Sequence, residues 1–363
     1  MRLSPSLLAA ALAALAAPAS SHDTQSPSPD ASAAPPYRHH LLGLHRALIE
    51  IDSTSGIEAQ IGNALAEFFR LRSWGTIIDF VPSRDNTPDG MPRMNIVAWP
   101  EPGVPNPKVL LTSHMDAVPP YIPYHIDAET ESDITKDIRI SGRGSVDAKG
   151  SVAAMIQALD NLLSSRRVDP ADVMLAFVVG EEIAGDGMRY LDEAFRRLED
   201  GLQPKFDAVI FGEPTENKLA CGHKGGLACT LTAHGIPGHS GYPWLGKSAN
   251  ELVVRAMARI FDTDLGSSVE FGNTTVNLGR MQGGVAANVI PEKAVADLMV
   301  RVALGPQETG YKIVQERIQK ILDEVDDEAF DFECSQGYGF VKTNCDVDGA
   351  YWKPIPHEER WNS

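Results

Sequence analysis

One histidine and five acidic residues stand where apolar segments of the sequence end, and these residue types bind metals and move protons. His114 and Asp116 follow the apolar run Val109–Leu111 and lie two residues apart. Residues i and i+2 of an extended segment point to the same side, so the two side chains can touch. A metal-binding imidazole usually donates its second N–H to a carboxylate. The pair therefore predicts a metal ligand with its orienting acid, and the alternative is an ordinary polar strand end.

The other four acidic residues also follow predicted strands or begin a predicted helix. They are Asp147, Glu181, Glu182 and Glu213. A carboxylate before a helix can cap backbone N–H groups, or it can bridge two cations. Adjacent glutamates permit a division of labour, in which one binds metal and the other takes a proton from water. Each residue alone is more simply a solvated side chain. Together, at the carboxyl ends of strands in an α/β sheet, they predict a metal centre.

The elements that must position these residues alternate between strand and helix. Predicted helices cover Tyr37–Asp52, Ile57–Leu71, Ala148–Leu163 and Met188–Leu198. Predicted strands cover Ile77–Val81, Asn95–Trp99, Val109–Thr112, Ile138–Ser141, Val173–Val179 and Ala208–Phe211. The unbroken apolar run Val173–Val179 is typical of a central parallel strand that is covered on both faces. The alternation predicts a doubly wound α/β domain over residues 37–218.

The pattern changes near residue 219. Predicted strands then cover Leu227–His234, Thr275–Met281 and Ala294–Val302, and predicted helices cover Asn250–Phe261 and Tyr311–Val325. Two helices with antiparallel strands predict an inserted α+β domain over residues 219–326. The first domain is then expected to resume, incompletely, over residues 327–363, where few residues are apolar.

The N-terminus predicts secretion. Arg2 precedes the apolar run Leu7–Ala17, and small residues at Ala17 and Ala19 fit a cleavage site, so residues 1–19 read as a signal peptide. The run is too short to cross a bilayer, which needs about 20 apolar residues. Residues 20–36 are rich in Ser, Pro and Ala and predict a disordered lead-in. We expect the mature protein to be soluble and extracellular.

Charge and modification signals agree with that compartment. The net charge of −17 argues against a nucleic acid or an anionic membrane as partner. Asn273 begins an Asn-Thr-Thr glycosylation sequon. The four cysteines allow up to two disulfides with three possible connectivities.

Five segments resemble, in order and spacing, the motifs of the zinc-dependent aminoacylase, carboxypeptidase and deacetylase superfamily, a group of metallopeptidases. They are LLTSHMDAVP, GRGSVDAKGSVAAMI, VVGEEIAGDGM, FGEPT and GIPGHSGYP. The resemblance extends over about Tyr37–Asp348 and is strongest to secreted fungal members called probable carboxypeptidases. It implies a doubly wound zinc-hydrolase domain that carries an inserted dimerisation, or lid, domain.

The resemblance also implies roles for the residues at the strand ends. Two zinc ions per subunit are expected, with Asp147 bridging them. The implied ligands are His114, Asp147 and Glu213 for the first ion and Asp147 with Glu182 for the second. Asp116 would orient His114, and Glu181 would be the general base that activates water to attack an amide carbonyl. Oxygen and imidazole ligands suit zinc, with cobalt or manganese as alternatives.

The inserted domain is implied to contribute substrate-binding residues. His239 matches a histidine that dimers of the superfamily supply across subunits, so we expect a homodimer. Asn288 and Arg301 match positions that hold the carbonyl and the carboxylate of the substrate, and the planar guanidinium of Arg301 suits a carboxylate. The expected substrate is a peptide cleaved at its C-terminal bond. An N-acyl amino acid, which presents the same amide beside a free carboxylate, is the alternative.

The end of the chain departs from the resemblance. Superfamily members end with further strands and a last histidine on the second zinc, whereas the match here fades after Asn344–Gly349. His357 follows Pro356 without an apolar strand before it, so we do not expect it to substitute. A gene-model error or a truncated homologue would explain the departure. We therefore expect a weakened second zinc site, and the competing hypothesis is a non-catalytic homologue that keeps dimerisation and partial metal binding.

Overall fold

The computed structural model describes residues 34–343 except 85–86, 89, 104 and 131–132. The predicted signal peptide, most of the lead-in, Cys345 and His357 lie outside the described residues. The described chain divides into two compact units, and the boundary along the sequence falls between Asn217 and Lys218. No described helix is long and apolar enough to span a bilayer.

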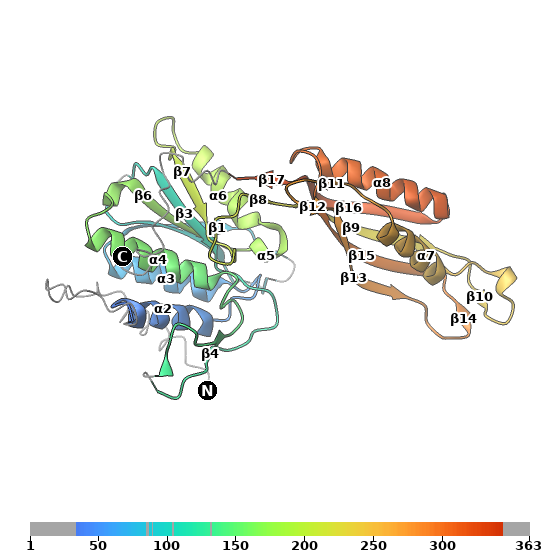
Figure 1. Cartoon of the computed structure of the whole chain (residues 1–363), viewed down its shortest axis with the longest axis horizontal. Helices are drawn as coiled ribbons and strands as arrows, with labels where there is room; N and C mark the ends of the chain where they lie inside the picture. The colour runs from blue at the N-terminus through green and yellow to red at the C-terminus, as the bar shows by residue number, and fades with distance from the viewer. Residues whose placement is uncertain (1–33, 85–86, 89, 104, 131–132, 344–363) are drawn as a thin grey trace. The chain divides into compact units, whose positions relative to one another are not determined.

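The first unit is built on a five-stranded sheet in the order β1-β2-β6-β3-β7 (Figure 1). The strands are β1 (Gly75–Val81), β2 (Arg93–Trp99), β3 (Val109–His114), β6 (Val173–Val178) and β7 (Ala208–Phe211). Strand β3 runs parallel to β6 on one side and to β7 on the other, whereas β2 is antiparallel to both β1 and β6. All side chains of β6 are buried, as its unbroken apolar sequence predicted.

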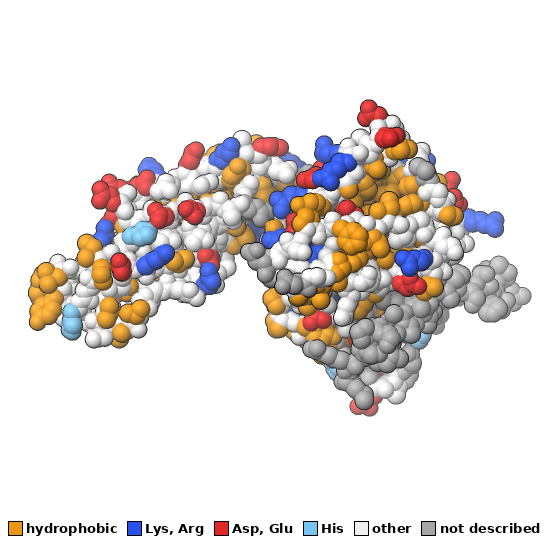
Figure 2. All heavy atoms as spheres, turned by 180° about the vertical axis from the view of Figure 1, so that it is seen from behind, with side chains coloured by type: hydrophobic (Ala, Val, Ile, Leu, Met, Phe, Trp, Pro, Cys, Tyr) orange, Lys and Arg blue, Asp and Glu red, His pale blue; other side chains and the backbone are white. Residues whose placement is uncertain are grey.

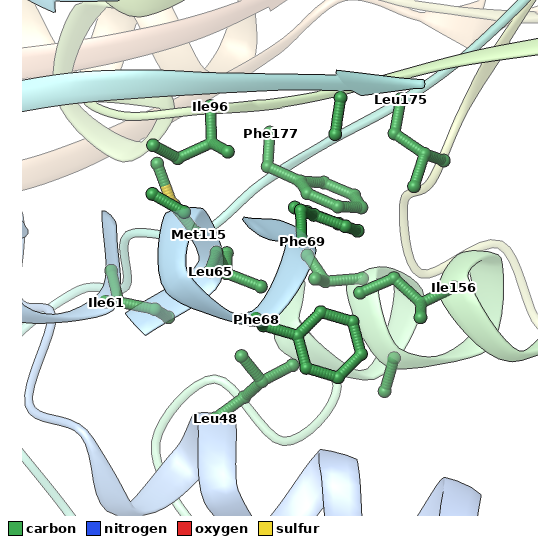
Figure 3. Close-up of a cluster of buried hydrophobic side chains, with 14 of the residues drawn as sticks. Leu48, Ile61, Leu65, Phe68, Phe69, Ile96, Met115, Ile156, Leu175 and Phe177 are labelled. Atoms are coloured by element: carbon green, nitrogen blue, oxygen red, sulfur yellow. The ribbon is translucent and has the colours of Figure 1, made fainter. Parts of the chain in front are cut away.

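Helices cover both faces of this sheet, which confirms the predicted doubly wound α/β class. The helices are α2 (Arg38–Glu50), α3 (Ala59–Leu71), α4 (Lys149–Ser164), the short α5 (Glu181–Ala184) and α6 (Asp186–Arg196). Figure 3 shows side chains of α2, α3 and α4 packed beneath the sheet, where Phe69 stacks on Phe177 with ring centroids 6.3 Å apart. On the other face, Leu191 of α6 packs against Val97 and Met174. The burial of these faces fixes the sheet whose strand ends carry the acidic residues.

Two local predictions for this unit need correction. The strand predicted over Ile138–Ser141 is reduced to β5 (Ile140–Ser141), which pairs with β4 (His125–Ile126) outside the main sheet. The segment is too short and too exposed to enter the core. Strand β6 is central, but only one of its neighbours is parallel.

The second unit is a four-stranded antiparallel sheet in the order β13-β15-β9-β16, with two helices packed on one face. The sheet strands are β9 (Gly225–His234), β13 (Thr275–Gly283), β15 (Lys293–Val302) and β16 (Phe330–Tyr338), and the helices are α7 (Ala249–Asp262) and α8 (Gly310–Val325). Shorter elements are β8 (Gly222–His223), β10 (Gly238–His239), η3 (Pro243–Leu245), β11 (Ser267–Ser268), β12 (Gly272–Asn273), β14 (Val289–Ile290) and β17 (Val341–Lys342). Buried and exposed residues alternate along β9 and β15, as expected for a sheet with one solvated face.

The chain does not return to the first unit at residue 327. Strand β16 instead pairs with β9 and completes the second sheet, and β17 then pairs with β8. The physical reason is visible in its residues, since Phe330, Phe332 and Cys334 alternate with exposed Asp331 and Glu333. This period of two is the pattern of a half-buried strand.

A disulfide joins two neighbouring strands of this sheet. Cys229 of β9 and Cys334 of β16 lie directly opposite each other and are bonded, across 105 residues of sequence. This bond selects one of the pairings that the sequence left open.

We expect the double variant Cys229→Ala, Cys334→Ala to destabilise the second unit. A loop of this length contributes about 4–5 kcal/mol of chain-entropy stabilisation, so the transition of the second unit should fall by roughly 10–20 °C. Differential scanning calorimetry of the full chain measures this, and the transition of the first unit is the internal control. An unchanged second transition would contradict the prediction.

Candidate metal centre and active site

The site lies where three parallel strands end at the same edge of the first sheet. His114 is the last residue of β3 and pairs with Val178, the last residue of β6, while Thr112 pairs with Phe211 at the end of β7. The segments that follow these strands therefore emerge side by side. This edge, the carboxyl end of the parallel strands, is where α/β sheets of this kind build binding sites.

The structure brings four of the predicted acidic residues around the imidazole of His114. His114 Nε2 lies 2.9 Å from Asp147 Oδ1, 3.8 Å from Glu213 Oε2 and 3.9 Å from Glu181 Oε2. Glu182 is the fourth, because its carboxylate and ligand atoms of His114 and Asp147 all lie within 4.8 Å of one another. The imidazole is buried, whereas the side chains of Asp147, Glu181 and Glu213 are about half exposed. The histidine of the centre is therefore held in the core, while its carboxylates are accessible to a ligand.

Asp116 is the fully buried partner of this cluster. Its Oδ1 lies 3.5 Å from His114 Nδ1 and accepts the backbone N–H of Glu181 at 3.1 Å. Its Oδ2 accepts the hydroxyl of Ser55 at 2.7 Å and the N–H of Glu182 at 3.3 Å. Burial acts to raise the pKa of Asp116, but His114, the Ser55 hydroxyl and the N–H of Glu181 outweigh burial and lower it. Asp116 is therefore a carboxylate, placed on the side of the imidazole away from the cluster.

The segment that carries Asp147 is held by the residue two positions later. Asp147 precedes α4, its peptide bond to Ala148 is cis, and Lys149 begins the helix. The Lys149 side chain is buried, and its Nζ donates to the carbonyl of Ile51 at 2.8 Å. This contact fixes the start of α4 against the segment that follows α2.

The turn that carries Glu181 and Glu182 is fixed from behind by buried ion pairs. Arg93 of β2 is fully buried and pairs with Asp186 at 2.8 Å and with Glu58 at 3.3 Å. Asp186 begins α6, directly after the turn, and Gly185 closes the turn through its N–H to the carbonyl of Gly180 at 2.8 Å. The two glutamates therefore project from a braced turn.

Crowding of like charges shifts the pKa values at this edge. Burial and neighbouring carboxylates raise the pKa of Glu213 to about 7, although His114 opposes this, and burial and Asp147 raise the pKa of Glu182. Burial acts to lower the pKa of His114, but hydrogen bonds to Asp116 and Asp147 outweigh it and raise that pKa to about 11. Such an excess of negative charge around one imidazole is the environment that a divalent cation stabilises.

The donor set fits a metal ion. One imidazole nitrogen and several carboxylate oxygens suit Zn²⁺, and also Mn²⁺ or Co²⁺. The residues His114, Asp147 and Glu182 form a group that could hold an ion, with Glu213 beside them. This group combines residues that the sequence assigned to two adjacent ions that share Asp147.

The predicted residues of the second unit fall at two different places. His239 of β10 pairs with Val289 of β14, and the N–H of Ser240 donates to the Asn288 carbonyl at 3.0 Å, so His239 and Asn288 are neighbours. Arg301 is exposed at the far end of β15, opposite Gly226 and Thr275. About eight strand residues, or roughly 26 Å, separate Arg301 from the end of β15 nearest Asn288.

The surface around His239 is apolar. Tyr242, Trp244 and Leu245 follow His239 and are exposed, and the ring of Tyr242 lies 5.9 Å from the imidazole. Figure 2 shows hydrophobic side chains gathered at this end of the second unit. Asn273, the predicted glycosylation site, is exposed on β12.

Sequence reasoning missed three residues that shape the centre, namely Ser55, Lys149 and Arg93. Ser55 and Arg93 lie far from the motifs along the chain, and nothing in their local spacing marks them. Lys149 lies inside the segment GRGSVDAKG, so a role for this lysine beside Asp147 could have been predicted from the sequence.

Two relatives and a family model show which family the chain belongs to. A Sordaria macrospora protein described as a peptidase M20 domain-containing protein is 50% identical over 354 residues, covering 92% of this chain and 78% of the relative. The chain belongs to the M20 peptidase family. A probable carboxypeptidase of Aspergillus oryzae is 43% identical, covering 85% of this chain and 72% of that protein. Residues 221–329 match the peptidase dimerisation domain of the family.

Solved structures agree on the fold. An M20 family metallo-carboxypeptidase from Sulfolobus solfataricus matches with a TM-score of 0.61 at 17% identity, covering 84% of this chain and 80% of that one. A tripeptidase from Staphylococcus aureus matches with a TM-score of 0.59 at 23% identity, covering 84% and 77%. Both comparisons support the M20 fold, and the predicted family is confirmed by the sequence relatives.

Metal affinity of this M20 peptidase should rise with pH. With its pKa at about 11, His114 carries a proton at neutral pH that a metal must displace, and Glu213 carries part of a second proton below about pH 7. The affinity should therefore rise about tenfold per pH unit above pH 7, and more steeply below it. Zinc titration by calorimetry, in buffers of different ionisation enthalpy, measures the affinity and the released protons. A flat affinity with no proton release would contradict this protonation of His114.

Proposed function

We propose that this M20 peptidase is a zinc-dependent carboxypeptidase, which hydrolyses an amide bond next to a free carboxylate. The observation that carries the proposal is the group of His114, Asp147, Glu182 and Glu213 at one sheet edge, with Glu181 beside it. Support comes from the Aspergillus oryzae relative named probable carboxypeptidase. We also propose a peptide substrate, because the name of this relative, probable carboxypeptidase, describes an enzyme that cleaves peptides.

Zinc is proposed to be held by His114, Asp147 and Glu213, and a second ion by Asp147 and Glu182. A bound zinc ion lowers the pKa of an adjacent water and polarises an amide carbonyl. The chain itself keeps the ligands in place, because Asp116 holds the far nitrogen of His114 and the amides of the Glu181–Glu182 turn.

Glu181 is proposed as the general base. Its carboxylate is half exposed and lies 3.9 Å from His114 Nε2, so it stands beside a proposed metal ligand and is accessible to a water molecule. Glu181 takes a proton from the attacking water as the water oxygen bonds to the carbonyl carbon. The C–N bond then breaks, and Glu181 returns the proton to the leaving amine nitrogen.

Substrate binding is proposed to involve Arg301, His239 and Asn288 in a homodimer. The exposed guanidinium of Arg301 can bind the substrate carboxylate with two hydrogen bonds. A dipeptide is much shorter than the roughly 26 Å that separate Arg301 from the region of Asn288. One copy therefore cannot bring both residues to one small substrate, which supports a site shared between two copies.

We further propose that the protein is secreted. The disulfide between Cys229 and Cys334 suits an oxidising compartment. The exposed Asn273 sequon and the apolar N-terminal segment support the same compartment.

The variant Glu181→Gln tests the base. Turnover should fall by about 10²–10⁴-fold, because the amide of glutamine accepts no proton, whereas the metal content should stay nearly unchanged. The matched control is Glu182→Gln, which should lose metal because Glu182 is a proposed ligand. Peptide hydrolysis and metal analysis after dialysis measure both. Parallel loss of metal and activity in Glu181→Gln would make Glu181 a ligand and the assignment wrong.

Mixing two inactive variants tests the shared site. His239→Ala and Glu181→Gln should each be inactive alone. Mixed dimers of the two should regain activity, because one of their two sites receives both intact residues. The recovered activity is measured after subunit exchange, with mixed dimers detected by differently tagged chains. No recovery in verified mixed dimers would confine each site to one subunit.

A further inference from the structure

The segment between α2 and α3 lies directly against the residues that follow β3. This segment, Ile51–Ser55, is here called the α2–α3 loop. The hydroxyl of Ser53 donates to the Met115 carbonyl at 2.7 Å, and the N–H of Ser55 donates to the Ala117 carbonyl at 3.1 Å. The N–H of Ala117 returns a hydrogen bond to the Ser53 carbonyl at 3.1 Å. These bonds hold the loop and the segment around Asp116 in one register.

Ser55 is the residue of this loop that reaches a side chain of the centre. Its hydroxyl donates to Asp116 Oδ2 at 2.7 Å, the shortest of the contacts to this carboxylate, and both residues are buried. The other contacts come from the amides of Glu181 and Glu182 at 3.1 and 3.3 Å and from His114 Nδ1 at 3.5 Å. The hydroxyl therefore fixes the rotation of the carboxylate that faces the imidazole.

The same loop also holds the segment of Asp147. Lys149, two residues after Asp147, donates a hydrogen bond from Nζ to the Ile51 carbonyl at 2.8 Å. The loop thus joins the segment of His114 and the start of α4, and Asp116 extends the connection to the turn of Glu181 and Glu182. Three ligand-bearing segments from distant parts of the sequence share one support.

We propose that Ser55 is a positioning residue of the metal centre. It holds the Asp116 carboxylate in the orientation that aims His114 at the metal and fixes the amides of the Glu181–Glu182 turn. This inference rests on the proposed function. Loss of the group that bonds a ligating histidine typically lowers metal affinity by about 10–100-fold. Ser55 acts one step further out, through Asp116, so its loss should lower the affinity by about tenfold, at the low end of that range.

If Ser55 only supported the loop, removing another buried hydroxyl of the same loop should lower zinc affinity equally. Ser53 provides this control. Ser53 is also a buried serine, and its hydroxyl also makes a 2.7 Å hydrogen bond, but to the backbone carbonyl of Met115. Ser53→Ala removes a hydroxyl from the same loop without touching Asp116. The two variants therefore separate support of the loop from support of the carboxylate.

The experiment compares Ser55→Ala with Ser53→Ala in the full chain. Zinc affinity is measured by competition with a chelator, and thermal stability is measured on the metal-free proteins. Ser55→Ala should bind zinc about tenfold more weakly, the low end of the range for losing a direct partner of a ligating histidine, while Ser53→Ala stays within about twofold of the wild type. Both variants should lose thermal stability, and Ser55→Ala should lose more, because its hydroxyl bonds a charged group. Ser55→Thr, which keeps the hydroxyl, should recover most of the affinity.

The outcomes that would overturn the inference are distinct. Equal losses of zinc affinity in the two alanine variants would make the loop a general support, and unchanged affinity in Ser55→Ala would show that Asp116 is held without Ser55. If Ser55→Ala does not fold, Ser55→Cys fills the same space with a weaker donor and gives the same comparison. A wild-type chain that binds no zinc would instead overturn the proposed function.

Discussion

The buried carboxylate of Asp116 is the constraint on which the rest of the site depends. An ionised carboxylate without solvent is costly unless donors surround it. Here the donors are the Ser55 hydroxyl and the amides of Glu181 and Glu182, and the imidazole of His114 lies 3.5 Å away and bonds the Asp116 backbone carbonyl at 3.1 Å. These groups come from the α2–α3 loop, from the turn after β6 and from the end of β3. Satisfying one buried charge therefore fixes the relative positions of three segments.

The outer side of the centre, in contrast, carries an excess of negative charge. The carboxylates of Asp147, Glu181, Glu182 and Glu213 converge on one imidazole, and the raised pKa of Glu213, at about 7, results from burial together with their mutual repulsion. Behind the site, Arg93 is buried between Glu58 and Asp186 and balances their charges outside the cluster. Arg93 therefore stabilises the turn that carries Glu181 and Glu182. The acidic residues at the sheet edge remain available to bind a cation.

Most of this arrangement could be predicted from local patterns, and the rest could not for a physical reason. Apolar runs located β3, β6 and β7, and the carboxyl ends of parallel strands must meet, so the cluster followed from the strand predictions. Ser55 could not be found this way, because its contact with Asp116 spans 61 residues and a serine between two helices is ordinary. Strand β16, in contrast, could have been predicted, because the alternation of Phe330, Phe332 and Cys334 with polar residues is present in the sequence.

The two units organise their polar residues in different ways. In the first unit, buried hydrogen bonds hold the cluster, and each member is placed by an element that the core fixes. In the second unit, His239 and Asn288 lie together on short paired strands, and exposed Arg301 lies at the far end of β15. The rigid strand between them keeps this separation constant. In the proposed homodimer, two chains supply these groups to one small substrate, whereas the residues of the metal centre all lie in one chain.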